Sequence, residues 1–193
     1  MVDNSLISRS QSGDIEAFNQ LVEQYQRLIF NVALRMVCDA EIAADVTQDT
    51  FLAAYKGIDK FRGGSFKAWL IRIATNCCYD HFRMVKRSRS ISLDAMLLES
   101  TPANMVDESE SPEDFASRKE MGRMLSEGLA SLPEDQRLVI ILYDIQEFSY
   151  EEIAESVGCS LGTVKSRLNR GRNRLKNFLY ERRELLPPEF RLG

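Results

Sequence analysis

Two segments of the sequence concentrate side chains that bind phosphates and base edges. The later segment, residues 160–183, sets one acid, Glu181, against a group of cations: Lys165, Arg167, Arg170, Arg172, Arg174, Lys176, Arg182 and Arg183. The earlier segment, residues 62–89, sets Asp80 against a second group: Arg62, Lys67, Arg72, Arg83, Lys86, Arg87 and Arg89. The net charge of the whole chain is -4. The clustering therefore indicates two local contacts with nucleic acid rather than general affinity for polyanions.

The residue pattern gives little support for metal binding, nucleotide binding or nucleophilic catalysis. Cys77 and Cys78 precede His81 on what could be one helical face, but no clustered residues complete a tetrahedral metal site. The chain has no CxxC pair, no glycine-rich phosphate loop and no nucleophile elbow. We therefore expect a protein that is not an enzyme and that needs no metal, cofactor or small-molecule substrate.

Composition and the order of hydrophobic residues point to a folded protein inside the cell. Hydrophobic residues make up 44% of the chain and charged residues 28%, which is typical of a globular domain. The first residues do not resemble a signal peptide, and no apolar run reaches membrane-spanning length. We expect a cytoplasmic protein with reduced thiols and no membrane insertion.

The basic segments must be positioned by helices, because apolar residues recur at steps of three and four. Residues 14–38, 41–58 and 66–85 each follow this pattern, and Gly63 and Gly64 form a turn before the third helix. These helices form a predicted N-terminal domain, residues 1–87. The periodicity then fails in a serine-rich and acidic stretch, which predicts a flexible acidic linker over residues 88–115.

A second helical domain is predicted over residues 116–183, followed by a short tail, 184–193, to which we assign no role. Ser149 and Glu152 form a capping box that starts one helix, Gly158 suits its left-handed end, and Ser160 can cap the next. Together these signals predict a helix-turn-helix. The fold class is therefore all-α, with two small helical domains joined by the linker.

The second helix of this pair has two faces. Val164 and Leu168 point inward, one turn apart, and the opposite face carries four residues that can read base edges in the major groove: Lys165, Ser166, Asn169 and Arg170. Three further arginines suit contacts with phosphates: Arg167, Arg172 and Arg174. A basic helix face in contact with solvent is the alternative, but the turn and cap signals favour DNA binding.

Three motifs of this half resemble region four of the extracytoplasmic-function sigma factors of bacterial RNA polymerase. They are Leu-Pro-Glu-Asp-Gln-Arg at 132–137, Tyr-Glu-Glu-Ile-Ala at 150–154 and Gly-Thr-Val-Lys-Ser-Arg at 162–167. The N-terminal half resembles region two of the same family, through Asp-Val-Thr-Gln-Asp-Thr-Phe at 45–51 and the stretch 61–76. The resemblance implies a protein that binds core RNA polymerase, directs it to specific promoters and helps open the DNA for transcription initiation.

The resemblance also implies roles for individual residues and partners. Asp45, Gln48 and Asp49 would dock on the β′ coiled coil of the polymerase, and the C-terminal domain would meet the β flap. The helix from Ser160 would read the minus-thirty-five element. Contacts with the minus-ten element are implied for Phe61, Arg62, Lys67, Arg72, Asn76 and Arg83.

Phe61 and Asn76 match positions that help hold a flipped base, although Phe61 fits core packing equally well. An anti-sigma factor, often membrane-bound, is a further implied partner, and the acidic linker would thread the polymerase interior. An ordinary helix-turn-helix regulator that acts without polymerase is the alternative. It would explain the C-terminal half alone.

Overall fold

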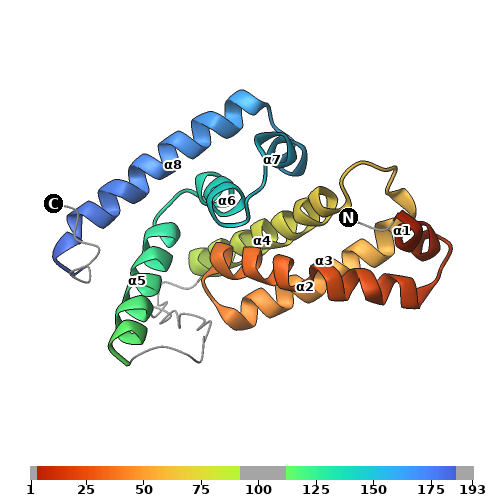
Figure 1. Cartoon of the computed structure of the whole chain (residues 1–193), viewed down its shortest axis with the longest axis horizontal. Coiled ribbons are helices and arrows are strands. Elements are labelled where there is room, and N and C mark those ends of the chain that lie inside the picture. The colour runs from red at the N-terminus through yellow and green to blue at the C-terminus, as the bar shows by residue number, and fades with distance from the viewer. Residues whose placement is uncertain (1–3, 92–111, 186–193) are drawn as a thin grey trace.

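The structure is a computed structural model that describes residues 4–91 and 112–185. Within these two ranges the chain is helical and contains no strand (Figure 1). The predicted all-α fold with two helical domains is confirmed.

The N-terminal domain is built from four α-helices and a short 3₁₀ turn. They are α1 (Asn4–Gln11), α2 (Ile15–Val37), α3 (Ala40–Gly57), η1 (Ile58–Lys60) and α4 (Phe66–Ile91). Asp14 caps α2 by accepting a 3.1 Å hydrogen bond from the Ala17 amide, and Asp39 caps α3 in the same way. These caps explain why α2 and α3 begin close to the predicted positions. Helix α1 was not predicted, because only Leu6 and Ile7 supply apolar contacts from it.

The C-terminal domain begins with α5 (Pro112–Ala130) and ends in the long helix α8 (Leu161–Glu181), with η3 (Arg183–Leu185) after it. Between them lie α6 (Glu134–Ile140), η2 (Ile141–Ile145) and α7 (Tyr150–Val157). Element η2 continues α6 as a π-helix, and the Gln146 amide donates to the Ile141 carbonyl at 3.0 Å. Pro133 stands at the N-cap of α6.

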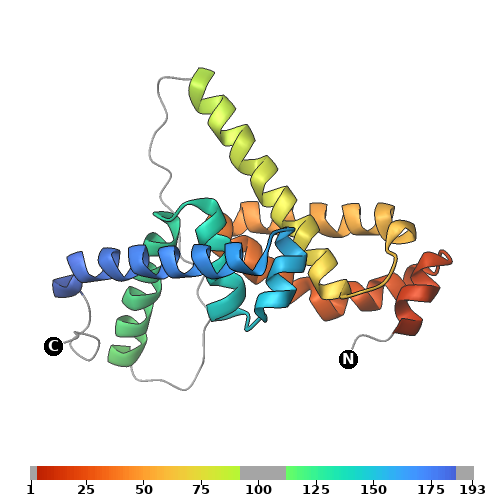
Figure 2. The ribbon, with the colours of Figure 1, turned by 90° about the horizontal axis from the view of Figure 1, so that it is seen from above.

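The two domains share one hydrophobic core. Helix α7 packs on α4, while α2 contacts α5, α6 and η2. In Figure 1, α6 and α7 lie next to α2 and α4, and Figure 2 shows the far end of α4 projecting away from the other helices. The two domains therefore pack against each other. We call this the closed arrangement, and the sequence did not predict it.

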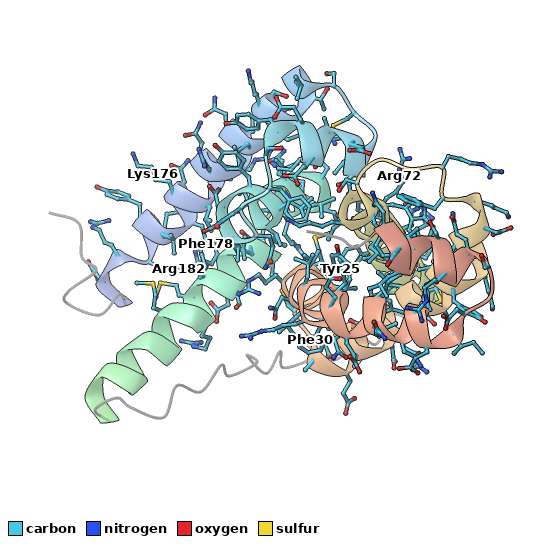
Figure 3. All side chains as sticks on the ribbon, turned by 45° about the vertical axis from the view of Figure 1, so that its right-hand side comes forward. Tyr25, Phe30, Arg72, Lys176, Phe178 and Arg182 are labelled. Atoms are coloured by element: carbon cyan, nitrogen blue, oxygen red, sulfur yellow. The ribbon has the colours of Figure 1, made fainter. Side chains whose placement is uncertain are left out.

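Gly128 allows the C-terminal half of α8 to approach α5 closely. A Cβ atom at Gly128 would stand 2.6 Å from Leu175 Cδ1 and 3.1 Å from Phe178 Cδ1, which leaves no room for a larger residue. Figure 3 labels Phe178 on this stretch of α8.

The predicted domain limits at 87 and 116 remain predictions. Helix α4 continues to Ile91 and α5 starts at Pro112, so both ends of the predicted linker are helical. The acidic centre of that linker, residues 92–111, and the tail beyond residue 185 lie outside the described residues.

Candidate nucleic-acid interface

Helices α7 and α8 form the helix-turn-helix, and the local signals that predicted it are all present. Ser149 and Glu152 make both hydrogen bonds of the capping box, at 3.1 and 2.8 Å. Gly158 ends α7 in the left-handed region, with φ at 68°. Ser160 then caps α8 by accepting a 3.1 Å hydrogen bond from the Thr163 amide. The two helices are thereby joined by a tight turn that fixes their crossing.

The inner face of α8 is held against the rest of the domain. Val164 and Leu168 are buried as predicted, and Ile153 of α7 is buried with them. Gly171 lies against α6, where a Cβ atom would stand 2.8 Å from Ile140 Cδ1. Because this side of α8 is packed over two turns, the orientation of its outer side is fixed.

The outer face of α8 carries the four residues predicted to read bases. Lys165, Ser166, Asn169 and Arg170 are all exposed. Arg170 donates from Nε to the Ser166 carbonyl at 3.2 Å and from Nη2 to Ser166 Oγ at 3.3 Å. These bonds hold the guanidinium along the helix surface, with donors that remain accessible to a base or a phosphate.

The three arginines predicted to hold phosphates have partners within the protein. Arg167 pairs with Asp135 of α6 at 2.9 Å, and Arg174 donates to Gln136 Oε1 at 3.2 Å. Arg172 donates from Nε and Nη2 to the two oxygens of the Asp144 carboxylate, with Nε 3.0 Å from Oδ2. The sequence pattern did not reveal these partners. A phosphate contact from any of the three would require the arginine to share or exchange its carboxylate or amide partner.

An aromatic cluster supports the loop that precedes α4. The Phe61 ring lies 5.5 Å from Phe66 and 5.4 Å from Trp69, and Phe66 lies 5.7 Å from Tyr25. Phe61 is 9% exposed, so in this arrangement it packs in the core. Gln11 of α1 fixes its backbone by donating to the Phe61 carbonyl at 2.8 Å and the Ile58 carbonyl at 3.0 Å. Gln11 is a positioning residue that the sequence analysis missed.

The other residues predicted to contact the minus-ten element lie on α4 and the loop before it. Arg62 and Asn76 are exposed. Arg83 is exposed and pairs with Asp80 one turn earlier. Lys67 and Arg72 lie on the side of α4 near the C-terminal domain. Lys67 is half-buried, with Nζ 3.6 Å from the centre of the Phe148 ring, whereas Arg72 lies near Gly158 at the end of α7 and remains exposed. The structure thus brings two of the predicted phosphate contacts against α7 and its flanks.

A groove of about 820 Å³ runs between α2 and α3. Apolar side chains line much of it, including Phe30, which Figure 3 labels, and the partly exposed Leu52 and Tyr55. Gln48 also lines the groove, while Asp45 and Asp49 are exposed on the same helix. Apolar side chains dominate the lining of this groove, which suits the apolar face of a partner helix.

Two adjacent thiols of α4, Cys77 and Cys78, are held as neutral groups by burial. Burial raises the pKa of Cys78 to about 12, and burial also raises the pKa of Cys77. Among the described residues no group of three histidine, cysteine or acidic side chains is placed to hold a metal ion. No helix in the described ranges is both long and apolar enough to cross a membrane.

Comparison with known proteins matches both halves of the chain. Residues 21–88 match the model of sigma-70 region 2, and residues 122–175 match that of sigma-70 region 4. The ECF RNA polymerase sigma-E factor of Escherichia coli K12 is 36% identical over 180 residues, which cover 92% of this chain and 94% of the relative. The chain belongs to the extracytoplasmic-function sigma factors.

Other sigma factors support the same assignment. The RNA polymerase sigma-H factor of Pseudomonas aeruginosa is 38% identical over 184 residues, covering 92% of this chain and 93% of the relative. The fold resembles the sigma factor RpoE of Bartonella quintana in complex with the anti-sigma factor NepR. The TM-score is 0.69 and the identity 30%, with 84% of this chain and 96% of that chain covered. The fold also resembles CnrH in complex with the cytosolic domain of CnrY. The TM-score is 0.68 and the identity 27%, with 94% of this chain and 99% of that chain covered.

Membership of this family confirms the main functional prediction. The sigma factor binds core RNA polymerase and directs it to promoters, and it is an initiation factor rather than an enzyme. The alternative, a helix-turn-helix regulator that acts without polymerase, accounts for region 4 but not for region 2.

Proposed function

We propose that the sigma factor contacts promoter DNA through two separate faces while it is bound to core RNA polymerase. The minus-thirty-five face is the outer side of α8, made of Lys165, Ser166, Asn169 and Arg170. The minus-ten face lies on α4 and its preceding loop, where Phe61 and Asn76 hold a base and the cations hold phosphates: Arg62, Lys67, Arg72 and Arg83. The exposure of the four α8 residues above a rigidly packed inner face is the observation that carries the proposal.

The electrostatic roles of the remaining α8 arginines follow from their partners. Three arginines would position the helix on the DNA backbone: Arg167, Arg172 and Arg174. Each would contact a phosphate while it keeps its side-chain partner in α6 or η2. Such contacts add affinity without sequence preference. Phe61 must leave part of its aromatic packing to hold a base, since it is buried in the closed arrangement.

The groove between α2 and α3 is our proposed site for the coiled coil of the polymerase β′ subunit. Gln48 lies in the groove, and Asp45 and Asp49 would pair with basic residues of that subunit. The C-terminal domain, residues 116–183, would contact the β flap, and the N-terminal domain, residues 1–87, would carry the β′ contact.

An anti-sigma factor is the second proposed partner. RpoE of Bartonella quintana and CnrH have each been solved with such a partner, NepR and the cytosolic domain of CnrY. We place the sigma factor in the cytoplasm, where polymerase and promoter DNA are found. The acidic linker between the domains would pass through the polymerase interior.

Reconstitution with core polymerase tests the proposal. The purified chain and core enzyme are incubated with a library of randomised promoters, and the transcribed members are sequenced. We expect two conserved elements at a fixed spacing. The alternative, a regulator that acts without polymerase, would be supported if the purified chain alone bound the same duplex elements with equal specificity.

A further inference from the structure

The first turn of α8 exposes a large apolar side chain beside the residues proposed to read bases. Leu161, the first residue of α8, is 41% exposed. Leu161, Lys165 and Asn169 are spaced four residues apart, so they lie on one face of the helix. Val164 and Leu168, on the packed side, are buried. Leu161 therefore extends the exposed face of α8 by one turn toward the start of the helix.

The turn that carries Leu161 is held in a fixed orientation. Ser160 caps α8 through the Thr163 amide, and the hydroxyl oxygens of Ser160 and Thr163 lie 2.9 Å apart, within hydrogen-bond distance. Figure 1 shows this end of α8 at the outer edge of the molecule. In a helix-turn-helix, the first residues of the second helix are the ones that contact base edges. Leu161 is therefore held by a rigid turn where the helix would enter the major groove.

A glycine next to Leu161 leaves space that the fold does not use. Beyond its own helix, a Cβ atom at Gly162 would meet only Ser160 Oγ among the described residues, at 3.8 Å. At Gly171, by contrast, a Cβ atom would stand 2.8 Å from Ile140 Cδ1, so packing requires that glycine. Glycine disfavours a helix relative to alanine. The open space at Gly162 therefore suits the close approach of a molecule outside the chain.

We infer that Leu161 contacts the 5-methyl group of a thymine in the minus-thirty-five element. Base edges in the major groove carry hydrogen-bond donors and acceptors, and the thymine methyl is the one apolar group among them. The Leu161 side chain has no hydrogen-bonding group, so this methyl is the base feature that it can distinguish. Gly162 gives the edge of the base pair room to approach. The inference rests on the proposed role of α8 in reading this element.

Deoxyuridine in the promoter tests the contact directly, because it pairs as thymine does and lacks only the 5-methyl group. Holoenzyme made from core polymerase and the full chain is measured by run-off transcription from a promoter recovered as above. Each thymine of the minus-thirty-five element, on either strand, is replaced by deoxyuridine in turn. At one position we expect wild-type holoenzyme to lose about two- to fourfold, as for one methyl group left out of an apolar contact.

L161A supplies the second half of a double-mutant cycle. Without the leucine side chain, the thymine and deoxyuridine promoters should be transcribed equally at the position that matters for the wild type. L125A is the matched control, because Leu125 is a 37% exposed leucine of α5 in the same domain. L125A should keep the wild-type ratio of activity between the two promoters, whatever its overall activity.

Two results would overturn the inference about Leu161. The first is a minus-thirty-five element that has no thymine, or one in which no deoxyuridine lowers wild-type activity. The second is an equal deoxyuridine effect in L161A and wild type, which would assign the exposed leucine to a protein contact. Failure of the proposed function gives a different result, because R170A would then leave both transcription and base preference unchanged.

Substitution of Gly162 tests the open space separately. G162A adds a methyl group where the chain leaves room, and alanine favours the helix, so the urea midpoint should rise slightly. Transcription should nevertheless fall about fivefold or more, because the added group crowds the DNA contact. G171A is the contrast, since its added group would clash with Ile140 and lower the urea midpoint. Wild-type transcription by G162A would contradict the use of this space by DNA.

Discussion

Arg137 of α6 joins the two domains by donating a hydrogen bond to the backbone carbonyl of Met36, the last buried residue of α2. The same guanidinium donates to the Ala130 carbonyl at 2.6 Å and to the Leu132 carbonyl at 3.2 Å. One buried side chain therefore satisfies carbonyl groups at the ends of α2 and α5 and in the turn before α6.

Replacing Arg137 by alanine should reduce the free energy of unfolding by about 3 kcal/mol, because three carbonyl groups lose their donor in a buried site. The measurement is urea denaturation followed by circular dichroism. R123A is the control, because the two ion pairs of Arg123 on α5 are exposed to solvent and stabilise the fold little. Equal midpoints for the two variants would contradict the anchoring role.

Arg170 and Arg172 should respond differently to substitution although both lie on α8. R170A should reduce transcription from the recovered promoter roughly 5- to 100-fold, as expected for loss of a bidentate base contact. It should also relax the preference at one base pair of the minus-thirty-five element. R172A should weaken all promoters to a similar extent, because a phosphate contact carries no sequence information. Run-off transcription from single-base promoter variants separates the two outcomes.

The apolar groove gives a prediction that involves polymerase alone. L52D places a charge on the 48% exposed Leu52 and should reduce the affinity for core enzyme about tenfold, with unchanged stability. M84D is the matched control, since Met84 is an exposed apolar residue of α4 outside the groove. Affinity is measured by fluorescence anisotropy in the absence of DNA. An equal loss for the control would show that the groove has no special role.

Cys78 should resist alkylation in the folded protein. Burial raises its pKa to about 12, so at pH 8 the reactive thiolate is about one part in ten thousand. Iodoacetamide labelling followed by mass spectrometry should show Cys78 modified only after addition of urea. Rapid labelling of Cys78 in the native chain, at the rate found in urea, would contradict its burial.

Features encoded by neighbouring residues were predictable from the sequence. Ser149, Gly158 and Ser160 each act within one turn of their own position, so their residue types predicted the helix-turn-helix boundaries. The exposure of Asn169 and Arg170 followed from helical periodicity, because Val164 and Leu168 mark the buried side. The resemblance to sigma factors added the roles that periodicity cannot supply.

Features that depend on distant residues were not predictable. Arg137 and Met36 are 101 residues apart, and no local pattern indicates that they meet. The pairing of Arg167 with Asp135 depends in the same way on how α8 crosses α6. Nothing in the sequence indicated that Lys67 and Arg72 contact the C-terminal domain. Their neighbours there depend on the packing of α7 on α4.

The close approach at Gly128 has a mechanical consequence. Because Leu175 and Phe178 rest directly on the backbone of α5, the two helices can neither slide nor tilt apart without a clash or a void. The C-terminal half of α8 is packed closely on α5, and the N-terminal half of α8 carries the exposed residues proposed to contact bases. Any force that turns α5 therefore turns Asn169 and Arg170 with it.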